Sequence, residues 1–268
     1  AKVNKMQRIL SQARPYAAKV KEIFTNLEAS LSEDQKNSIP LLSSRSKEDS
    51  VLLLIISSDR GLCGAYNTNV IKAATKRIEE LVKSGKKVNL ITVGRKARSA
   101  FQRDSFTNRG IEVLETFVNL SSIPVSSESN LIAETAMKFY LSGEADKVEI
   151  ISTKFVSLVS SSVKNNTYLP IEKLESKSES QADPDILLEP SAEALVDTLL
   201  PMYTQNLIYQ TMLESTTSEL AARMTAMSNA TKNAKDFIHK LVLVYNKARQ
   251  ASITQEISEI VGGAAALE

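Results

Sequence analysis

Residues 51–64 read VLLLIISSDRGLCG, and this stretch decides the class of fold. Its first six residues are all apolar, which is typical of a strand that is buried on both faces of a sheet. The polar, glycine-containing segment after them indicates a turn. A helical pattern follows and ends near Gly85, and its apolar positions share one face: Val70, Ile71, Ala74, Ile78, Leu81 and Val82. The stretch therefore predicts a strand, a turn and a helix.

The pattern of strand and helix repeats downstream. Residues 88–93 predict a second strand, Gly94 opens a short basic helix, and residues 111–118 predict a third strand. Residues 147–159 are again rich in β-forming residues. Between these last two segments lies a helix with one apolar face: Leu131, Ile132, Thr135, Ala136, Phe139 and Tyr140. Strands that alternate with helices predict an α/β domain on a mostly parallel sheet.

The segment before this domain carries a seven-residue repeat. Its two apolar sets are Val3, Leu10, Ala17, Phe24 and Leu31, and Met6, Ala13, Val20 and Leu27. This is the pattern of a coiled-coil seam, and a single amphipathic helix on a globular core is the alternative. Pro15 falls inside the predicted helix and is expected to bend it.

The segment after the domain is a second long helix. Residues 202–261 contain neither glycine nor proline, and one α-helix of that length would measure about 90 Å. Apolar residues recur every seven positions: Leu213, Leu220, Met227, Ala234, Leu241 and Ala248. We predict an antiparallel two-helix coiled coil formed by the two ends of the chain. The predicted domains are residues 1–50 (coiled-coil helix and connector), 51–190 (α/β domain) and 191–268 (coiled-coil helix).

Composition excludes several classes of protein. The 268 residues include 33 Lys and Arg against 31 Asp and Glu, so bulk charge does not indicate a nucleic-acid binder. The single Cys63 and single His239 exclude an intrachain disulfide and multi-cysteine zinc motifs, and they leave few means of acid-base catalysis. The longest apolar run, residues 51–56, is far short of the roughly 20 residues that span a bilayer. We predict no catalytic residues, no metal, no cofactor and no direct membrane insertion.

The turn at residues 61–64 lies where α/β proteins often bind phosphate. It lacks the Lys-Ser/Thr pair of a P-loop and the third glycine of a dinucleotide fingerprint, so we interpret it as a packing turn with Cys63 as a small buried side chain. Two other classes stay open. An enzyme would need a phosphate ligand at this turn, and a dimeric coiled-coil adaptor would need a self-complementary seam on the long helix.

Three segments carry a specific resemblance. They are SDRGLCG at residues 58–64, ELAARMTAM at 219–227, and YNKARQASITQE at 245–256 with EIVGGA at 259–264. In this order they resemble the γ subunit of F-type ATP synthase, over nearly the whole chain. The resemblance implies a non-catalytic central rotor shaft, in which an antiparallel coiled coil carries an inserted Rossmann-like α/β domain called the foot. Such a shaft transmits rotation of the membrane c-ring to the catalytic α3β3 hexamer, and so couples proton flow to ATP synthesis or hydrolysis.

The resemblance also implies three sets of contact residues. The set that would contact the β subunit is Arg249, Gln250, Thr254 and Glu256. The set that would form an apolar bearing at the tip of the shaft, inside a sleeve of α and β subunits, is Ile257, Ile260, Val261 and Ala264. The set at which the foot would contact the c-ring and the ε subunit (δ in mitochondrial naming) is Ile186, Leu187, Leu188, Glu189 and Tyr66.

The chain departs from the family pattern in two places. Family members usually continue upstream of the segment that begins here with AKV, so we expect a longer natural start, and a transit peptide stays open. The chloroplast-type regulatory insert with its cysteine pair is missing. We expect a peripheral protein on the cytoplasmic face of a bacterial energy-coupling membrane, with the thylakoid or mitochondrial inner membrane as alternatives.

Overall fold

The computed structural model describes residues 2–43, 45, 47–171 and 192–265. Contacts divide the chain into two compact units, Ala1–Met224 and Thr225–Glu268. Helix α7, Ala192–Ala265, contributes to both units, and its two parts are treated separately below. The division into three domains that the sequence predicts, at residues 1–50, 51–190 and 191–268, remains a proposal.

The first unit is built on a five-stranded sheet in the order β3-β2-β1-β4-β5. The strands are β1 (Ser50–Ile56), β2 (Lys87–Val93), β3 (Glu112–Phe117), β4 (Lys147–Phe155) and β5 (Ser161–Leu169). Strand β1 pairs in parallel with β2 and β4, β2 pairs in parallel with β3, and only β5 is antiparallel to its neighbour. The predicted mostly parallel sheet is confirmed.

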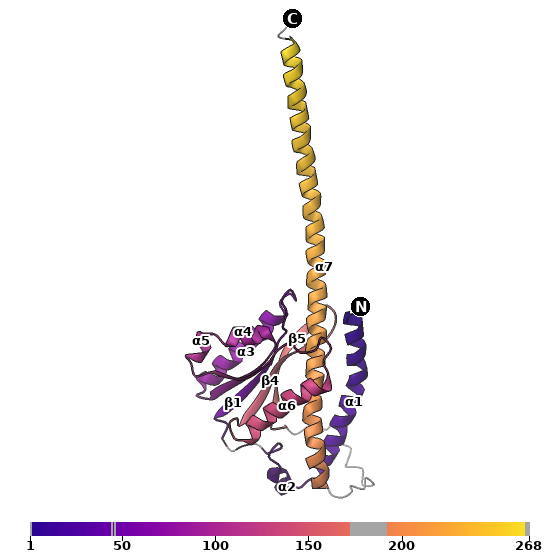
Figure 1. Ribbon diagram of the computed structural model, residues 1–268. Helices are drawn as coiled ribbons and strands as arrows, with labels where there is room; N and C mark the ends of the chain where they lie inside the picture. Colours follow the sequence, from indigo (N-terminus) through magenta and orange to yellow (C-terminus); the bar gives the residue numbers. More distant parts are fainter. Residues whose placement is uncertain (1, 44, 46, 172–191, 266–268) are drawn as a thin grey trace. The chain divides into compact units, whose positions relative to one another are not determined.

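Strand β1 is central because both of its faces are apolar. Val51, Leu53 and Ile55 pack toward α3 (Tyr66–Lys83) and α4 (Arg95–Phe101). The alternate set, Leu52, Leu54 and Ile56, packs toward the layer made by α6 (Ser126–Leu141), α1 (Lys2–Ser30) and the first part of α7. The result is three layers, with the sheet in the middle (Figure 1). Two short helices, α2 (Glu33–Ser38) and α5 (Asp104–Thr107), complete the unit.

Helix α1 lies antiparallel to the first part of α7. The Phe24 ring stacks on Tyr203 with centroids 4.7 Å apart, whereas Ala13 accepts a 3.0 Å hydrogen bond from Gln210 through its carbonyl. Numbers therefore fall along α7 as they rise along α1. The buried apolar residues of this segment belong to the two predicted sets: Val3, Met6, Leu10, Phe24, Leu27 and Leu31. The predicted antiparallel helix pair is confirmed, and Pro15 lies within α1.

Several local predictions need correction. Strand β5 was not predicted, because its sequence SSVKNNTYL is polar and, in this edge strand, only Tyr168 and Leu169 are buried. Two predicted helix faces were also too wide, because Leu131 is 54% exposed and Val82, near the end of α3, is 41% exposed. The face of α6 that packs on the sheet consists of Ile132, Ala133, Ala136, Met137 and Tyr140, with helical spacing that leaves Leu131 outside it.

A buried ion pair ties three elements of the first unit together. Glu149 on β4 is 3% exposed and receives two hydrogen bonds from the Arg77 guanidinium of α3, at 2.8 and 2.7 Å. Asn165 on β5 donates a third, at 2.7 Å. Burial alone would raise the pKa of Glu149, but these hydrogen bonds and the Arg77 charge outweigh it and hold the pKa below its usual value. The ionised carboxylate therefore stabilises the fold.

Glu149→Gln is expected to lower the free energy of unfolding at pH 7 by about 2 kcal/mol, because it leaves Arg77 without its buried counter-ion. A depressed pKa contributes stability above the unfolded value of about 4.3, and that contribution is lost as pH falls through the folded value. The deficit of the variant should therefore shrink in acid. Urea unfolding between pH 7 and pH 3 measures this, with Glu79→Gln, which replaces an exposed acid of α3, as the control. A deficit that does not change with pH would contradict the assignment.

Candidate functional site at the strand ends and on helix α7

The carboxyl ends of β1 and β2 are joined through Ser57. Its hydroxyl donates to the Val93 carbonyl at 3.0 Å and accepts from the Ala97 N–H at 2.9 Å. Gly94 makes this close approach possible, because a Cβ there would lie 2.6 Å from the Ser57 carbonyl oxygen and its φ is +92°. Ser57, the first residue after β1, thus already has the packing role that was predicted for this segment.

Asp59 extends the same junction to β3. One carboxylate oxygen accepts the N–H of Arg95 at 2.9 Å, and the other accepts the N–H of Asn119 at 2.9 Å. A single side chain therefore fastens the loops that follow three neighbouring strands. In proteins that bind phosphate at this edge, backbone N–H groups are directed at the ligand. Here an internal carboxylate occupies two of them, which favours the packing interpretation over a nucleotide site.

Asn67, at the start of α3, makes hydrogen bonds to the turn around Asp59. Its amide oxygen accepts the Ser58 N–H at 3.0 Å, and its amide nitrogen donates to the Arg60 carbonyl at 3.3 Å and to the Cys63 sulfur at 3.0 Å. Cys63 is 2% exposed, as its interpretation as a buried side chain predicted. Leu62 adopts a positive φ of 62° and is 76% exposed.

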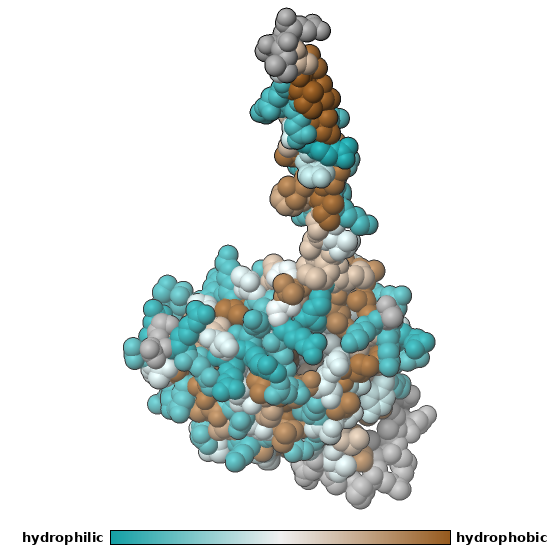
Figure 2. All heavy atoms as spheres, turned by 45° about the horizontal axis from the view of Figure 1, so that its top comes forward, coloured by the Kyte–Doolittle hydropathy of each residue, from teal (hydrophilic) through white to brown (hydrophobic). Residues whose placement is uncertain are grey.

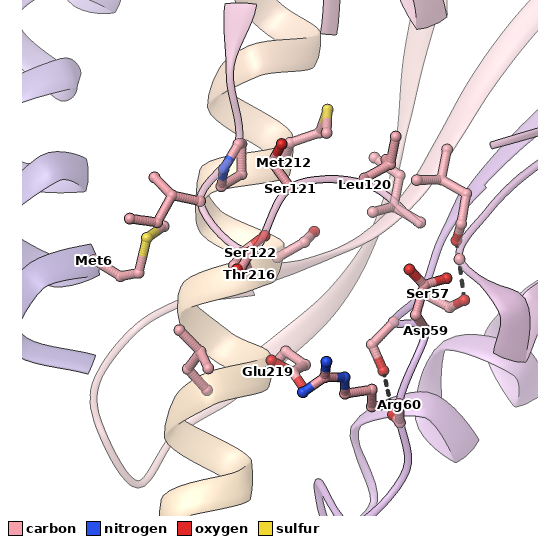
Figure 3. A pocket seen from close by; sticks show the side chains of 18 of the residues that line it. Met6, Ser57, Asp59, Arg60, Leu120, Ser121, Ser122, Met212, Thr216 and Glu219 are labelled. Carbon is pink, nitrogen blue, oxygen red and sulfur yellow. Dashed lines mark hydrogen bonds between the residues drawn. The ribbon is translucent and has the colours of Figure 1, made fainter. Parts of the chain in front are cut away.

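Helix α7 reaches this turn through Arg223. Its guanidinium donates to the Gly61 carbonyl at 3.2 Å and forms an ion pair with Glu219 one turn earlier. In Figure 3 Arg60 and Glu219 are turned toward one another. Burial raises the pKa of Glu219, and the charges of Arg223 and Arg60 oppose that rise. The sequence segments 58–64 and 219–227, which were recognised separately, are therefore in direct contact.

A cavity of about 540 Å³ lies between these loops, α1 and α7 (Figure 3). Met6, Leu120 and Met212 line it with apolar surface. Its cations are Lys2, Lys5, Arg60, Arg95 and Arg223, and its two carboxylates are Asp59 and Glu219. Asp59 already accepts two backbone N–H groups and Glu219 is paired with Arg223. These carboxylates are thus engaged in holding the fold, and the described residues contain no cluster of three or more His, Cys, Asp or Glu suited to a metal ion.

The four residues expected to contact a β subunit lie on α7 in the second unit, and all are exposed. The Thr254 hydroxyl donates to the Gln250 carbonyl at 2.8 Å, and Glu256 accepts a 3.4 Å hydrogen bond from Ser252. At 100° per residue Arg249, Gln250, Thr254 and Glu256 fall within one side of the helix. The structure brings them onto a shared surface, and their contact with a partner remains a prediction.

The predicted tip residues continue this surface. Ile257, Ile260 and Val261 are 56%, 73% and 62% exposed, and Ala264 is exposed as well. Together with Ile253 they follow helical spacing and form an apolar stripe, which Figure 2 shows as brown spheres gathered near the grey end of the chain. Exposed apolar surface of this extent is typical of a region that a partner covers.

A second apolar surface on α7 was missed by sequence reasoning. Residues 241–245 read LVLVY, and every one of them is between 49% and 65% exposed. Five consecutive positions at 100° spacing surround the helix, so this belt is apolar on all sides. A helix that is apolar all round is normally buried. The sequence contains this belt as a short apolar run. The seven-residue repeat describes a single face of the helix, so it includes only Leu241 of these five residues.

The five residues predicted for the foot contact cannot be treated together. Ile186, Leu187, Leu188 and Glu189 lie outside the described residues. Tyr66 is 6% exposed, so its ring lies in the interior of the first unit, and burial raises the pKa of its hydroxyl. In the neighbouring turn Leu62 is an exposed large apolar side chain.

Two remaining observations bear on the kind of protein. His239 is exposed on α7, as expected for a residue on a helix surface. Among the described residues, no helix combines the length and the apolar character needed to cross a bilayer.

Comparisons with known proteins give one consistent result. The family model described as ATP synthase matches residues 1–267. The ATP synthase gamma chain of a Synechococcus strain is 40% identical over 100% of this chain and 91% of its own length, and that of Nostoc punctiforme is 40% identical over 100% and 90%.

Solved structures resemble the fold. A chain of the Euglena gracilis mitochondrial ATP synthase, in an OSCP/F1/c-ring structure, has a TM-score of 0.61 at 22% identity and covers 99% of this chain and 94% of its own. A chain of the Tetrahymena thermophila mitochondrial ATP synthase, from a central stalk and c-ring structure, has a TM-score of 0.56 at 21% identity, over 86% and 100%.

Proposed function

This chain belongs to the family of ATP synthase γ chains, and on that premise we propose that it is the central rotor shaft of an F-type ATP synthase. In this role it transmits rotation of the membrane c-ring to the catalytic α3β3 hexamer and couples proton flow to ATP synthesis or hydrolysis. The observation that supports this function best is the exposed part of α7, where the belt at residues 241–245 and the apolar stripe near the end need a surrounding partner.

The subunit itself is proposed to be non-catalytic. The two carboxylates that line the cavity are engaged: Asp59, after β1, accepts two backbone N–H groups, and Glu219, on α7, is paired with Arg223. Catalysis would then belong to the α and β subunits, and this chain would change their conformation by turning. A densely packed scaffold suits that mechanical role, because it resists deformation when force is applied.

The contact surfaces follow from the same proposal. Arg249, Gln250, Thr254 and Glu256 would bond to loops of the β subunit, since a guanidinium offers a planar fork suited to a carboxylate. Ile257, Ile260, Val261 and Ala264 would turn inside an apolar sleeve, where non-directional contacts centre a shaft without imposing fixed registers. Residues 186–189 and the turn beside Tyr66 would contact the c-ring and the ε subunit.

The proposed location is the cytoplasmic face of a bacterial energy-coupling membrane, as a peripheral subunit. Relatives from cyanobacteria with 40% identity support a bacterial setting. The thylakoid and the mitochondrial inner membrane remain the alternatives.

Co-purification tests the proposed function. The chain, tagged at a surface site of α3, is expressed with the other subunits and isolated through the tag. The expected result is a stable complex that contains α and β subunits. Recovery of the chain alone, or as a homodimer that binds neither α nor β subunits, would favour the coiled-coil adaptor instead.

Removal of the residues after Gly262 is expected to weaken assembly more than coupling. The lost segment would centre the shaft, whereas Arg249 and Gln250 would transmit force. Dissociation of the complex at rising temperature and the ratio of protons pumped to ATP hydrolysed measure the two effects separately. Gln255→Ala, on the side of the helix opposite the apolar stripe at 100° per residue, is the control. Loss of coupling at unchanged assembly stability would show that the tip transmits torque.

A further inference from the structure

We propose that Arg223 is a positioning residue that clasps α7 to the turn after β1 and so fixes the end of the helical segment that the α/β domain holds. This inference rests on the proposed function, because a clasp of this kind matters to a subunit that passes rotation from its α/β domain into its long helix. It assigns a role to a contact that joins two distant segments of the chain.

The first observation is that the buried side chains of α7 change from apolar to polar along the helix. Its earlier buried side chains are apolar, among them Tyr203, Ile208, Met212 and Leu213. The next buried side chains are largely polar: Ser215, Thr217, Ser218 and Glu219, all at most 7% exposed. Polar side chains gain little from removal from water. The Thr217 hydroxyl bonds within the helix, to the Leu213 carbonyl, and the Ser218 hydroxyl has no hydrogen-bond partner among the described residues, so these side chains do not bond α7 to the turn after β1. That bond comes from Arg223.

The second observation is the place of Arg223 on the helix. Within the described residues of the first unit, Arg223 is the most C-terminal residue of α7 with a hydrogen bond to another element. Its Nη2 atom lies within bonding distance of two partners at once, the Gly61 carbonyl oxygen and a Glu219 carboxylate oxygen. Glu219 is 7% exposed, so this ion pair is screened little by solvent and it orients the guanidinium toward the turn.

The third observation is that the partner of Arg223 is itself fixed. Gly61 follows Arg60, whose carbonyl accepts from Asn67, and Asp59 just before them is bonded to the loops after β2 and β3. A hydrogen bond to Gly61 therefore connects α7 to three strand ends through one short path. A rigid acceptor is what a clasp requires, because a mobile loop would follow the helix instead of holding it.

Amide hydrogen exchange on the isolated full chain tests the clasp directly. Arg223→Ala is expected to speed exchange at residues 59–64 and 215–224 by at least about tenfold, while β1 keeps its protection. Arg223→Lys retains the charge but ends in a shorter ammonium group that no longer reaches as far toward Gly61, so it should lie between the alanine variant and the parent. Arg98→Ala, which removes an exposed arginine of α4, is the matched control and should change neither segment.

The assembled ATP synthase supplies the second readout. Arg223→Ala should lower the number of protons pumped per ATP hydrolysed several-fold with hydrolysis retained, and Arg223→Lys should restore part of it. Should the alanine variant fail to assemble, Arg223→Lys and Glu219→Gln carry the same measurement. Unchanged exchange at both segments would overturn the clasp, and altered exchange with a normal pumping ratio would overturn its role in positioning. Failure of the parent chain to couple at all would instead refute the proposed function and leave the exchange result standing.

Discussion

Replacing Arg249 by alanine is expected to lower the coupled ATPase rate of the assembled complex by at least about tenfold, the largest functional loss that we foresee for one side chain. The reason is its chemistry and position. Arg249 is exposed on a helix face that it shares with Gln250, and its guanidinium can bond a carboxylate in two parallel contacts that no other side chain reproduces. Truncation would leave a desolvated partner group on the β subunit without its counter-ion.

The same substitution should leave the isolated chain unaffected, because the side chain is exposed. Circular dichroism and thermal unfolding of the isolated variant measure this. Lys240→Ala is the matched control: it removes the same charge nine residues earlier, on the opposite side of the helix at 100° per residue. Equal turnover in Arg249→Ala and Lys240→Ala would count against the assigned contact with the β subunit.

Asp59→Ala is expected to cause the largest loss of stability, about 4 kcal/mol of unfolding free energy. Two charge-assisted hydrogen bonds to backbone N–H groups are lost, each contributing about 2 kcal/mol, and the ends of β1, β2 and β3 lose their common acceptor. Urea denaturation of the isolated chain measures the change. Asp236→Ala, an exposed acid of α7, should change stability by less than about 0.5 kcal/mol. A deficit below about 1 kcal/mol for Asp59→Ala would show that water replaces the carboxylate.

The fold was predictable where the pattern of apolar residues within one segment is sufficient to indicate its structure. Residues 51–56 are apolar at every position, so a strand buried on both faces follows without knowledge of its neighbours. The seven-residue repeat in α1 likewise determines which of its faces is buried. Strand β5 gave no such signal, because it is an edge strand whose pairing with β4 is a property of the backbone and hardly of its side chains.

The junction at the strand ends was only half predictable. The turn at residues 61–64 and the segment 219–227 each stood out in the sequence, yet nothing in either pattern specifies that Arg223 bonds to Gly61 across 162 residues. The same holds for Asp59, whose two N–H partners lie 36 and 60 residues downstream. The burial of Tyr66, which is 6% exposed, was likewise not evident from the sequence, and contact of the turn beside it with a partner stays a prediction.

Rotation of this chain inside the hexamer is the central claim, and a single-molecule assay tests it most directly. The α3β3 hexamer is fixed to a surface, and a visible probe is attached to a cysteine introduced as Lys76→Cys, on the exposed side of α3, where the native Cys63 is too buried to compete. The account predicts that the probe turns in one direction while ATP is present and stops when ATP is removed. A probe that stays stationary while the same complexes hydrolyse ATP would contradict it.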